Sequence, residues 1–238
     1  MIALPALPDA DEVAQQAEGH GGVEGRLVLV QDVDEGLAPL SRADRVEQVR
    51  LGVQQVPVAV GARLNLKRRE IEELLKAYTG ARTVIWLGQG YQDDHTDGHV
   101  DEVACFVRPG VVMALATADP RDGNFVALQD NLDRLKKAHD ASGRPLEVIP
   151  IRQPARRERD GVRLTLSYTN LYIGNRQVIM PGFEDSADQE AYRTIRRLFP
   201  NREVIQVPAL DIVAGGGGIH CITQQQPAPA PIPYDPVI

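Results

Sequence analysis

After residue 65 the spacing of apolar positions alternates between helical and strand-like periods, which predicts a mixed α/β fold. Apolar residues three and four positions apart predict a helix capped by Asn65 and stopped by Gly80. The apolar positions of this helix are Ile71, Leu74, Leu75 and Tyr78. A β-branched run over residues 83–87 then predicts a buried strand, whereas residues 1–64 contain only short valine-rich pieces.

A pattern of two strands, a helix and a further strand occurs twice in the rest of the chain. The first copy has strands at 105–108 and 111–115, a helix from about 125 with Leu128, Leu132 and Leu135 on one face, and a strand at 146–151. The second has strands at 171–173 and 177–180, a helix capped by Asp185 or Ser186 and ended by Pro200, and a strand at 203–207. The predicted helices recur roughly every 60 residues, and such a period predicts modules that stack or close into a ring.

The composition is that of a globular protein, because 43% of the residues are hydrophobic and 25% are charged. Asp and Glu outnumber Lys and Arg by 33 to 26, for a net charge of −7. This balance argues against a nucleic-acid partner and favours a small cationic ligand. No apolar run reaches the ~18 residues of a membrane span and no basic start of a signal peptide follows Met1, so we expect a cytoplasmic protein without a membrane partner. Two cysteines are too few for a disulfide framework or a Cys-based zinc site, which leaves a thiol for chemistry.

Two connecting segments carry most of the reactive side chains. Residues 92–101 contain several aspartates and two histidines, and residues 214–226 contain four consecutive glycines followed by His220 and Cys221. His99 and Cys221 follow the last strand of their units by nearly the same interval. If the units are related by rotation about an axis, equal positions face the same point. We therefore expect His99 and Cys221 to face each other.

The acidic segment admits three interpretations. Its charges can simply face water, as those of a polar loop do. It can also hold zinc or iron, since His95, Asp97, His99 and Asp101 are ligand types for these metals, although the Thr-Asp-Gly sequence at 96–98 argues against the helix that would place both histidines on one face. Thirdly, carboxylates such as that of Asp101 can bind the planar N–H fork of a guanidinium group.

The glycine run predicts either unusual backbone angles or close approach of the backbone to a ligand. A phosphate cradle is not indicated, because no Gly-Lys-Ser/Thr follows the run. We interpret Cys221 as a nucleophile and Cys105, inside an apolar strand, as a packing residue. A thiol with a pKa of about 8.5 becomes a thiolate at neutral pH only beside a cation or a base, and a guanidinium substrate would itself supply that cation.

Five stretches of the chain resemble a known family. They are 86–90 (Trp-Leu-Gly-Gln-Gly), 96–101 (Thr-Asp-Gly-His-Val-Asp), 167–170 (Ser-Tyr-Thr-Asn), 198–200 (Leu-Phe-Pro) and, most specifically, 216–225 (Gly-Gly-Gly-Ile-His-Cys-Ile-Thr-Gln-Gln). They are similar to the agmatine deiminases of the bacterial peptidylarginine deiminase type, in the guanidine-modifying superfamily, over about two thirds of the chain. The resemblance implies a partial, pentein-like α/β propeller of ββαβ units, with about three of five units recognisable. It divides the chain into an unmatched segment (1–62), deiminase-like units (63–227) and a Pro-rich tail (228–238).

The resemblance also implies a chemistry. Cys221 matches the nucleophile that attacks the guanidinium carbon of agmatine, His99 matches the general acid and base, and Asp101 matches a carboxylate that grips the guanidinium. The implied products are N-carbamoylputrescine and ammonia, a step of putrescine biosynthesis, formed through a Cys thiouronium intermediate without a metal or an organic cofactor.

Residues 1–62 depart from the family, which normally carries two further acidic motifs in its N-terminal part. We therefore expect about two of the five units to be missing or replaced, with exposed edges that promote self-association, and turnover weakened by the lack of a second carboxylate clamp. Two alternatives stay open. One is a metal-dependent hydrolase built on the Asp93–Asp101 cluster, and the other is an inactive remnant that only binds polyamines or a full-length subunit.

Overall fold

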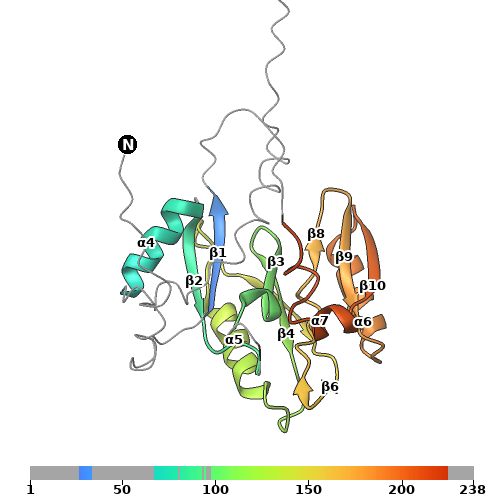
Figure 1. The fold of residues 1–238 in the computed structure, drawn as a ribbon. Helices are drawn as coiled ribbons and strands as arrows, with labels where there is room; N and C mark the ends of the chain where they lie inside the picture. Colours follow the sequence, from blue (N-terminus) through green and yellow to red (C-terminus); the bar gives the residue numbers. More distant parts are fainter. Residues whose placement is uncertain (1–26, 34–66, 80, 93, 95–97, 225–238) are drawn as a thin grey trace, which may run out of the picture.

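The computed structural model describes residues 27–33, 67–79, 81–92, 94 and 98–224 (Figure 1). Several predicted features lie outside these residues: the Asn65 cap, the Gly80 stop, the candidate ligands His95 and Asp97, and the Pro-rich tail at 228–238. Within the described residues, no helix combines the length and the apolar character that a membrane crossing requires.

The first repeat unit has the predicted order of elements. They are β3 (Ala104–Arg108), β4 (Val111–Ala116), α5 (Phe125–Lys137) and β5 (Glu147–Arg152). β3 pairs antiparallel to β4, and β4 pairs parallel to β5 after the crossover through α5. The three leucines predicted to share one face of the helix are all buried: Leu128, Leu132 and Leu135. β4 is a continuous apolar run because, as the central strand, it is buried on both faces.

The second unit repeats this topology. Its elements are β8 (Tyr172–Ile173), β9 (Gln177–Gly182), α6 (Asp188–Leu198) and β10 (Glu203–Pro208). β8 pairs antiparallel to β9, and β9 pairs parallel to β10. The predicted cap at Asp185 or Ser186 is wrong, because the residue that caps α6 is Ala187 and the helix begins at Asp188. The Asp185 carboxylate instead accepts the backbone N–H of Ala187 at 2.8 Å, which closes the turn that leads into the helix.

The helix and strand predicted before these units are also present, as α4 (Arg68–Thr79) and β2 (Ala81–Leu87). Figure 1 shows the three groups of elements side by side in chain order, from α4 and β2 through α5 to α6. β2, however, pairs antiparallel to β1 (Leu27–Val33), whereas the last strand of each full unit pairs parallel to the strand before its helix. The α/β class is therefore confirmed, while the count of three propeller units stays a prediction.

α4 packs on β2 through a small apolar cluster formed by Ile71, Leu75 and Trp86. The indole N–H of Trp86 donates to the Glu72 carboxylate at 2.6 Å, which adds a polar contact to the same interface. Leu74 was expected on the buried face but is 43% exposed. The prediction is wrong at this position because Ile71 and Leu75, one helical turn apart, already cover the part of β2 that α4 reaches.

Three short elements have no counterpart in the sequence prediction. They are the 3₁₀ helix η1 (Val100–Glu102), the hairpin of β6 (Glu158–Arg159) and β7 (Val162–Arg163), and the helix α7 (Leu210–Ala214). Both full repeat units, η1 and α7 contribute residues to one hydrophobic core. η1 and α7 matter most, because the predicted site residues lie in η1, just before it, and just after α7.

Candidate active site

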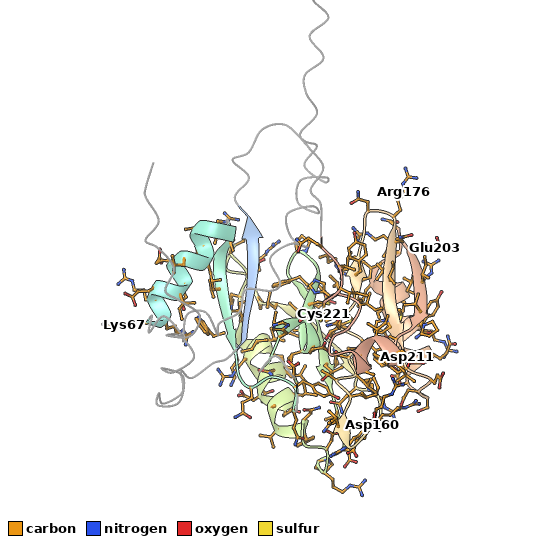
Figure 2. All side chains as sticks on the ribbon, viewed as in Figure 1. Lys67, Asp160, Arg176, Glu203, Asp211 and Cys221 are labelled. Carbon is orange, nitrogen blue, oxygen red and sulfur yellow. The ribbon has the colours of Figure 1, made fainter. Side chains whose placement is uncertain are left out.

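The two segments that carry His99 and Cys221 meet in the fold. A ring nitrogen of His99, a carboxylate oxygen of Asp101 and the sulfur of Cys221 all lie within 4.8 Å of one another. His99 immediately precedes η1, Asp101 lies within it, and Cys221 follows the glycine run after α7. Figure 2 shows Cys221 near the centre of the described fold, between the first and the second full repeat unit. The mid-chain and C-terminal segments therefore come together, and His99 lies close to Cys221.

A cleft opens beside the thiol, and three separate stretches of the chain line it. The lining residues are Asp94, His99, Glu102, Thr165, Val213, Gly216, Gly217 and Cys221. Among the described residues that line the cleft there is no lysine or arginine, whereas there are two carboxyl side chains. Such a lining attracts a cation.

Asn170 connects η1 to the segment that carries the thiol. Its side-chain nitrogen lies 2.9 Å from an oxygen of Asp101, 2.7 Å from an oxygen of Glu102 and 3.2 Å from the sulfur of Cys221. Its side-chain oxygen accepts the backbone N–H of His220 at 2.7 Å. An amide nitrogen carries two hydrogens, so at most two of the three acceptors are served at once. This buried side chain therefore sets the relative positions of two acids and a thiol.

Two positions of the run favour glycine for different structural reasons. Gly216 has φ +97°, a left-handed conformation that favours glycine. At Gly218 a Cβ atom would lie 2.3 Å from the side-chain oxygen of Asn170, so a side chain there would displace the amide. The prediction of unusual backbone angles is thus confirmed at Gly216, whereas the group that approaches Gly218 is not a ligand but Asn170 of the protein itself.

Asp101 is fixed from several directions. Its side chain is fully buried, and its Oδ2 lies 3.0 Å from Nδ1 of His220. Its backbone carbonyl accepts the Thr169 hydroxyl at 2.8 Å, and that hydroxyl lies 2.7 Å from the hydroxyl of Ser167. These contacts hold the carboxylate in one orientation, between the imidazole of His220 and the thiol of Cys221.

The loop that carries His99 is held at both ends. At its end, the carboxylate of Asp94 accepts the backbone N–H groups of Gly98 and His99, each at 3.1 Å. At its start, the side chain of Asn131 on α5 accepts the N–H of Gly88 at 2.6 Å and donates to the carbonyl of Gln89 at 2.8 Å. Hydrogen bonds to Asn131 and Asp94 therefore fix the backbone of this connection at its start and at its end.

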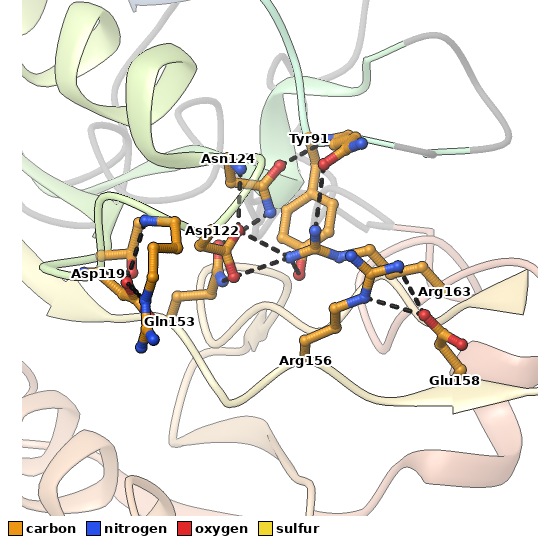
Figure 3. Close-up of polar contacts among 11 residues, drawn as sticks. Tyr91, Asp119, Asp122, Asn124, Gln153, Arg156, Glu158 and Arg163 are labelled. Carbon is orange, nitrogen blue, oxygen red and sulfur yellow. Dashed lines mark hydrogen bonds and ion pairs between the residues drawn. The ribbon is translucent and has the colours of Figure 1, made fainter.

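A second anchor of the same loop is the buried ion pair of Arg163 and Asp122 (Figure 3). The guanidinium lies 3.0 Å from the carboxylate, 3.2 Å from the side-chain oxygen of Gln92 and 5.2 Å from the centre of the Tyr91 ring. Asn124 accepts the backbone N–H of Gln92 at 2.7 Å. Residues of β7 and of the turn before α5 thus bind the chain a few residues before Asp94.

Burial, followed by the charge of Asp101, raises the pKa of Cys221 to about 11. Burial and the charges of Asp101 and Asp94 likewise raise the pKa of Glu102 well above its ordinary value. Burial raises the pKa of Cys105 to about 12, and this side chain lies within β3, as the packing interpretation predicts. In the free protein the Cys221 thiol is protonated at neutral pH, and a cation brought into the cleft would offset the negative charges that oppose the thiolate.

The model of the Porphyromonas-type peptidyl-arginine deiminase family matches residues 59–227. The chain belongs to this family. A Legionella pneumophila protein that carries agmatine deiminase as a provisional name is 48% identical over 164 residues, covering 68% of this chain and 47% of its own length. The agmatine deiminase of Pseudomonas putida is 42% identical over 183 residues, and the match covers 69% of this chain and 50% of that protein. The solved structure of an agmatine deiminase of Enterococcus faecalis matches with a TM-score of 0.67 at 35% identity. This match covers 69% of the chain and 50% of that structure. The chain thus spans about half the length of these relatives.

In this member of the deiminase family, the described site residues all lie within the matched range. Asn170 and His220 belong to the stretches that carry the family resemblance, but sequence reasoning gave them no role. Nothing in the local pattern marks Glu102. Two of the four predicted metal ligands, His95 and Asp97, lie outside the described residues, so that set stays a prediction. The other two, His99 and Asp101, have ligand atoms within 4.8 Å of each other.

Proposed function

We propose that this chain carries the catalytic centre of an agmatine deiminase, which hydrolyses the guanidinium C–N bond of agmatine to N-carbamoylputrescine and ammonia, a step toward putrescine. The observation that carries the proposal is the placement of His99, Asp101 and Cys221 within 4.8 Å of one another beside an acidic cleft. The agmatine deiminase names of the relatives support the same substrate.

In the first half-reaction, the guanidinium binds beside Asp101, whose carboxylate accepts its N–H groups. The cation offsets the charges that raise the pKa of Cys221, and the thiol proton passes to His99. The sulfur then forms a bond to the guanidinium carbon. His99 returns the proton to one nitrogen, the C–N bond breaks, and ammonia leaves a thiouronium on Cys221.

In the second half-reaction, His99 takes a proton from a water molecule, whose oxygen bonds to the thiouronium carbon. The C–S bond breaks with its electron pair on the sulfur, the hydroxyl proton passes to that sulfur and restores the thiol, and the urea group of N-carbamoylputrescine is released. His99 then passes its proton to the solvent. Asn170, 3.2 Å from the sulfur, donates a hydrogen bond that stabilises the thiolate in both steps. No step of this reaction requires an electron acceptor.

The wider setting forms part of the proposal. We place the chain in the cytoplasm, where thiols stay reduced. Its two ββαβ units would belong to a propeller about a pseudo-fivefold axis, and the sheet edges that neighbouring units would cover favour self-association. Turnover by the 238-residue chain is expected to be slow, because the family's N-terminal acidic motifs have no counterpart in its sequence.

The test is the formation of N-carbamoylputrescine and ammonia under single-turnover conditions, with protein in excess over agmatine. The wild type and a Cys105→Ser control, which loses only the buried thiol, should both form product, whereas Cys221→Ser should form none. Equal product from Cys221→Ser would overturn the proposal. Loss of product with a chelator, but not with iodoacetamide, would favour metal-dependent hydrolysis. Agmatine binding without product, unaffected by Cys221→Ala, would favour a binding protein.

A further inference from the structure

Glu102 is a buried acid that the proposed reaction does not use. It is the last residue of η1, directly after Asp101, and only 3% of its surface is exposed. It nevertheless lines the same cleft as His99 and Cys221. Glutamate is seldom fully buried without a pairing partner, so its position needs a physical reason.

The two carboxyl oxygens of Glu102 differ in their surroundings. Oε1 lies 2.7 Å from the side-chain nitrogen of Asn170. Oε2 is buried, and no residue in the described part of the chain offers it a hydrogen bond. A buried acceptor left without a donor costs about 1–3 kcal/mol, and more when the group is charged. A ligand that brings an N–H group into the cleft would remove this cost.

The charges around Glu102 also point to a cation. Negative or potentially negative groups face it from its own element, from the loop before it and from the C-terminal segment: Asp101, Asp94, Tyr91 and Cys221. The imidazoles near the group are those of His99, at the cleft, and His220, which reaches Asp101. The buried guanidinium of Arg163 is bonded to Asp122 and so does not serve the cleft. Two carboxyl groups that share one amide nitrogen repel each other unless a proton or a cation lies between them.

We infer that Glu102 is a second carboxylate of the guanidinium site, and that its Oε2 accepts an N–H of the substrate while Asp101 accepts another. A guanidinium presents five N–H donors in a plane, enough to serve two acids at once. The inference rests on the proposed function. It gives this chain the second carboxylate that its sequence was expected to lack, and supplies it from within η1.

A negative charge at Glu102 distinguishes the substrate from the product. The guanidinium of agmatine is a cation, whereas the urea group of N-carbamoylputrescine is neutral, although the two have nearly the same shape. A carboxylate at Glu102 therefore strengthens binding of the substrate and gives little to the product. The residue would set the preference for a charged amidine and help to release the urea once ammonia has left.

The experiment measures binding of agmatine and of N-carbamoylputrescine by calorimetry in the full chain with Cys221→Ala, which prevents the covalent step. In that background Glu102→Gln keeps the shape and an oxygen for Asn170 but removes the charge. We expect it to weaken agmatine binding roughly 10- to 100-fold, the range for a hydrogen bond to a charged group. Binding of N-carbamoylputrescine should change less than about threefold. Glu190→Gln, on the exposed side of α6, is the matched control and should change neither.

A second variant separates the effect of losing the charge from the effect of misfolding. Glu102→Asp keeps the charge on a shorter side chain and should retain the preference for agmatine over N-carbamoylputrescine, even where both bind more weakly. An unchanged preference in Glu102→Gln, or a preference lost equally in Glu102→Asp, would overturn the inference alone. If agmatine binds neither the Cys221→Ala chain nor the wild type, the proposed function fails together with it.

Discussion

The buried pair of Arg163 and Asp122 should carry much of the stability of the loop that bears His99. The Arg163 side chain is only 1% exposed and that of Asp122 is 12% exposed. Asp122→Asn keeps the shape of the side chain but leaves the guanidinium buried without its countercharge. Breaking a buried pair in this way costs about 3–5 kcal/mol. Since the carboxylate has some access to water, we expect the lower end, about 3 kcal/mol of the free energy of unfolding.

The assay is urea-induced unfolding followed by circular dichroism, which reports on all the helices and strands. Asp119→Asn is the control, because Asp119 lies in the same turn and bonds Arg121 at 3.0 Å on the exposed surface. Exposed pairs contribute little, so this variant should leave the midpoint unchanged. Replacing both partners with apolar residues, Arg163→Met with Asp122→Leu, should recover most of the lost stability.

The reasoning would be refuted if Asp122→Asn and Asp119→Asn shifted the unfolding midpoint equally. It would also be refuted if the double replacement were less stable than Asp122→Asn alone. In either case the contacts of Arg163 with Tyr91 and Gln92 would not be the anchor of the loop.

Three further predictions concern the thiol, the glycine run and acid stability. Iodoacetamide should label Cys221 and not Cys105. The rate of labelling should rise about tenfold per pH unit between pH 7 and 9, because the pKa of Cys221 is raised to about 11. Peptide mass mapping measures the labelling of each cysteine, and a rate that levels off below pH 9 would contradict the prediction. Gly218→Ala should displace Asn170 and slow N-carbamoylputrescine formation at least about tenfold, while unfolding still follows one transition; an unchanged rate would show that Asn170 does not orient the sulfur. Burial alone would raise the pKa of Asp122, but hydrogen bonds from Asn124 and Arg163 outweigh it and lower the pKa. The resulting stability is present above the unfolded value of about 3.9 and is lost as pH falls through the lower folded value, so urea midpoints should fall less in Asp122→Asn than in the wild type between about pH 5 and pH 2.

The repeat could be predicted from the sequence because each unit is built from local signals. Apolar positions three and four residues apart mark α5 and α6, and short β-branched runs around turns mark the paired strands. The orientation of β1 against β2 had no such signal, because pairing between residues 48 to 60 positions apart depends on the fold as a whole. β6, β7 and α7 are too short to show a period.

The site was predictable only in part, for a related reason. The nearly equal intervals that follow the strands β2 and β10 point to His99 and Cys221, and a dense acidic segment points to Asp101. The partners that hold them lie far away in sequence: Asn170 is 69 positions from Asp101 and 51 from Cys221. Glu102 looks like any polar residue after Asp101, and only its burial within the fold distinguishes it. Contacts of this kind leave no periodic trace in one sequence.

The most direct measurement of the central claim is to trap the covalent intermediate. The chain is mixed with agmatine, quenched in acid and digested, and the cysteine-containing peptides are weighed by mass spectrometry. The account predicts that the Cys221 peptide gains the mass of agmatine less that of ammonia, while the Cys105 peptide is unchanged. N-carbamoylputrescine formed by a chain whose Cys221 peptide never carries this adduct would contradict it.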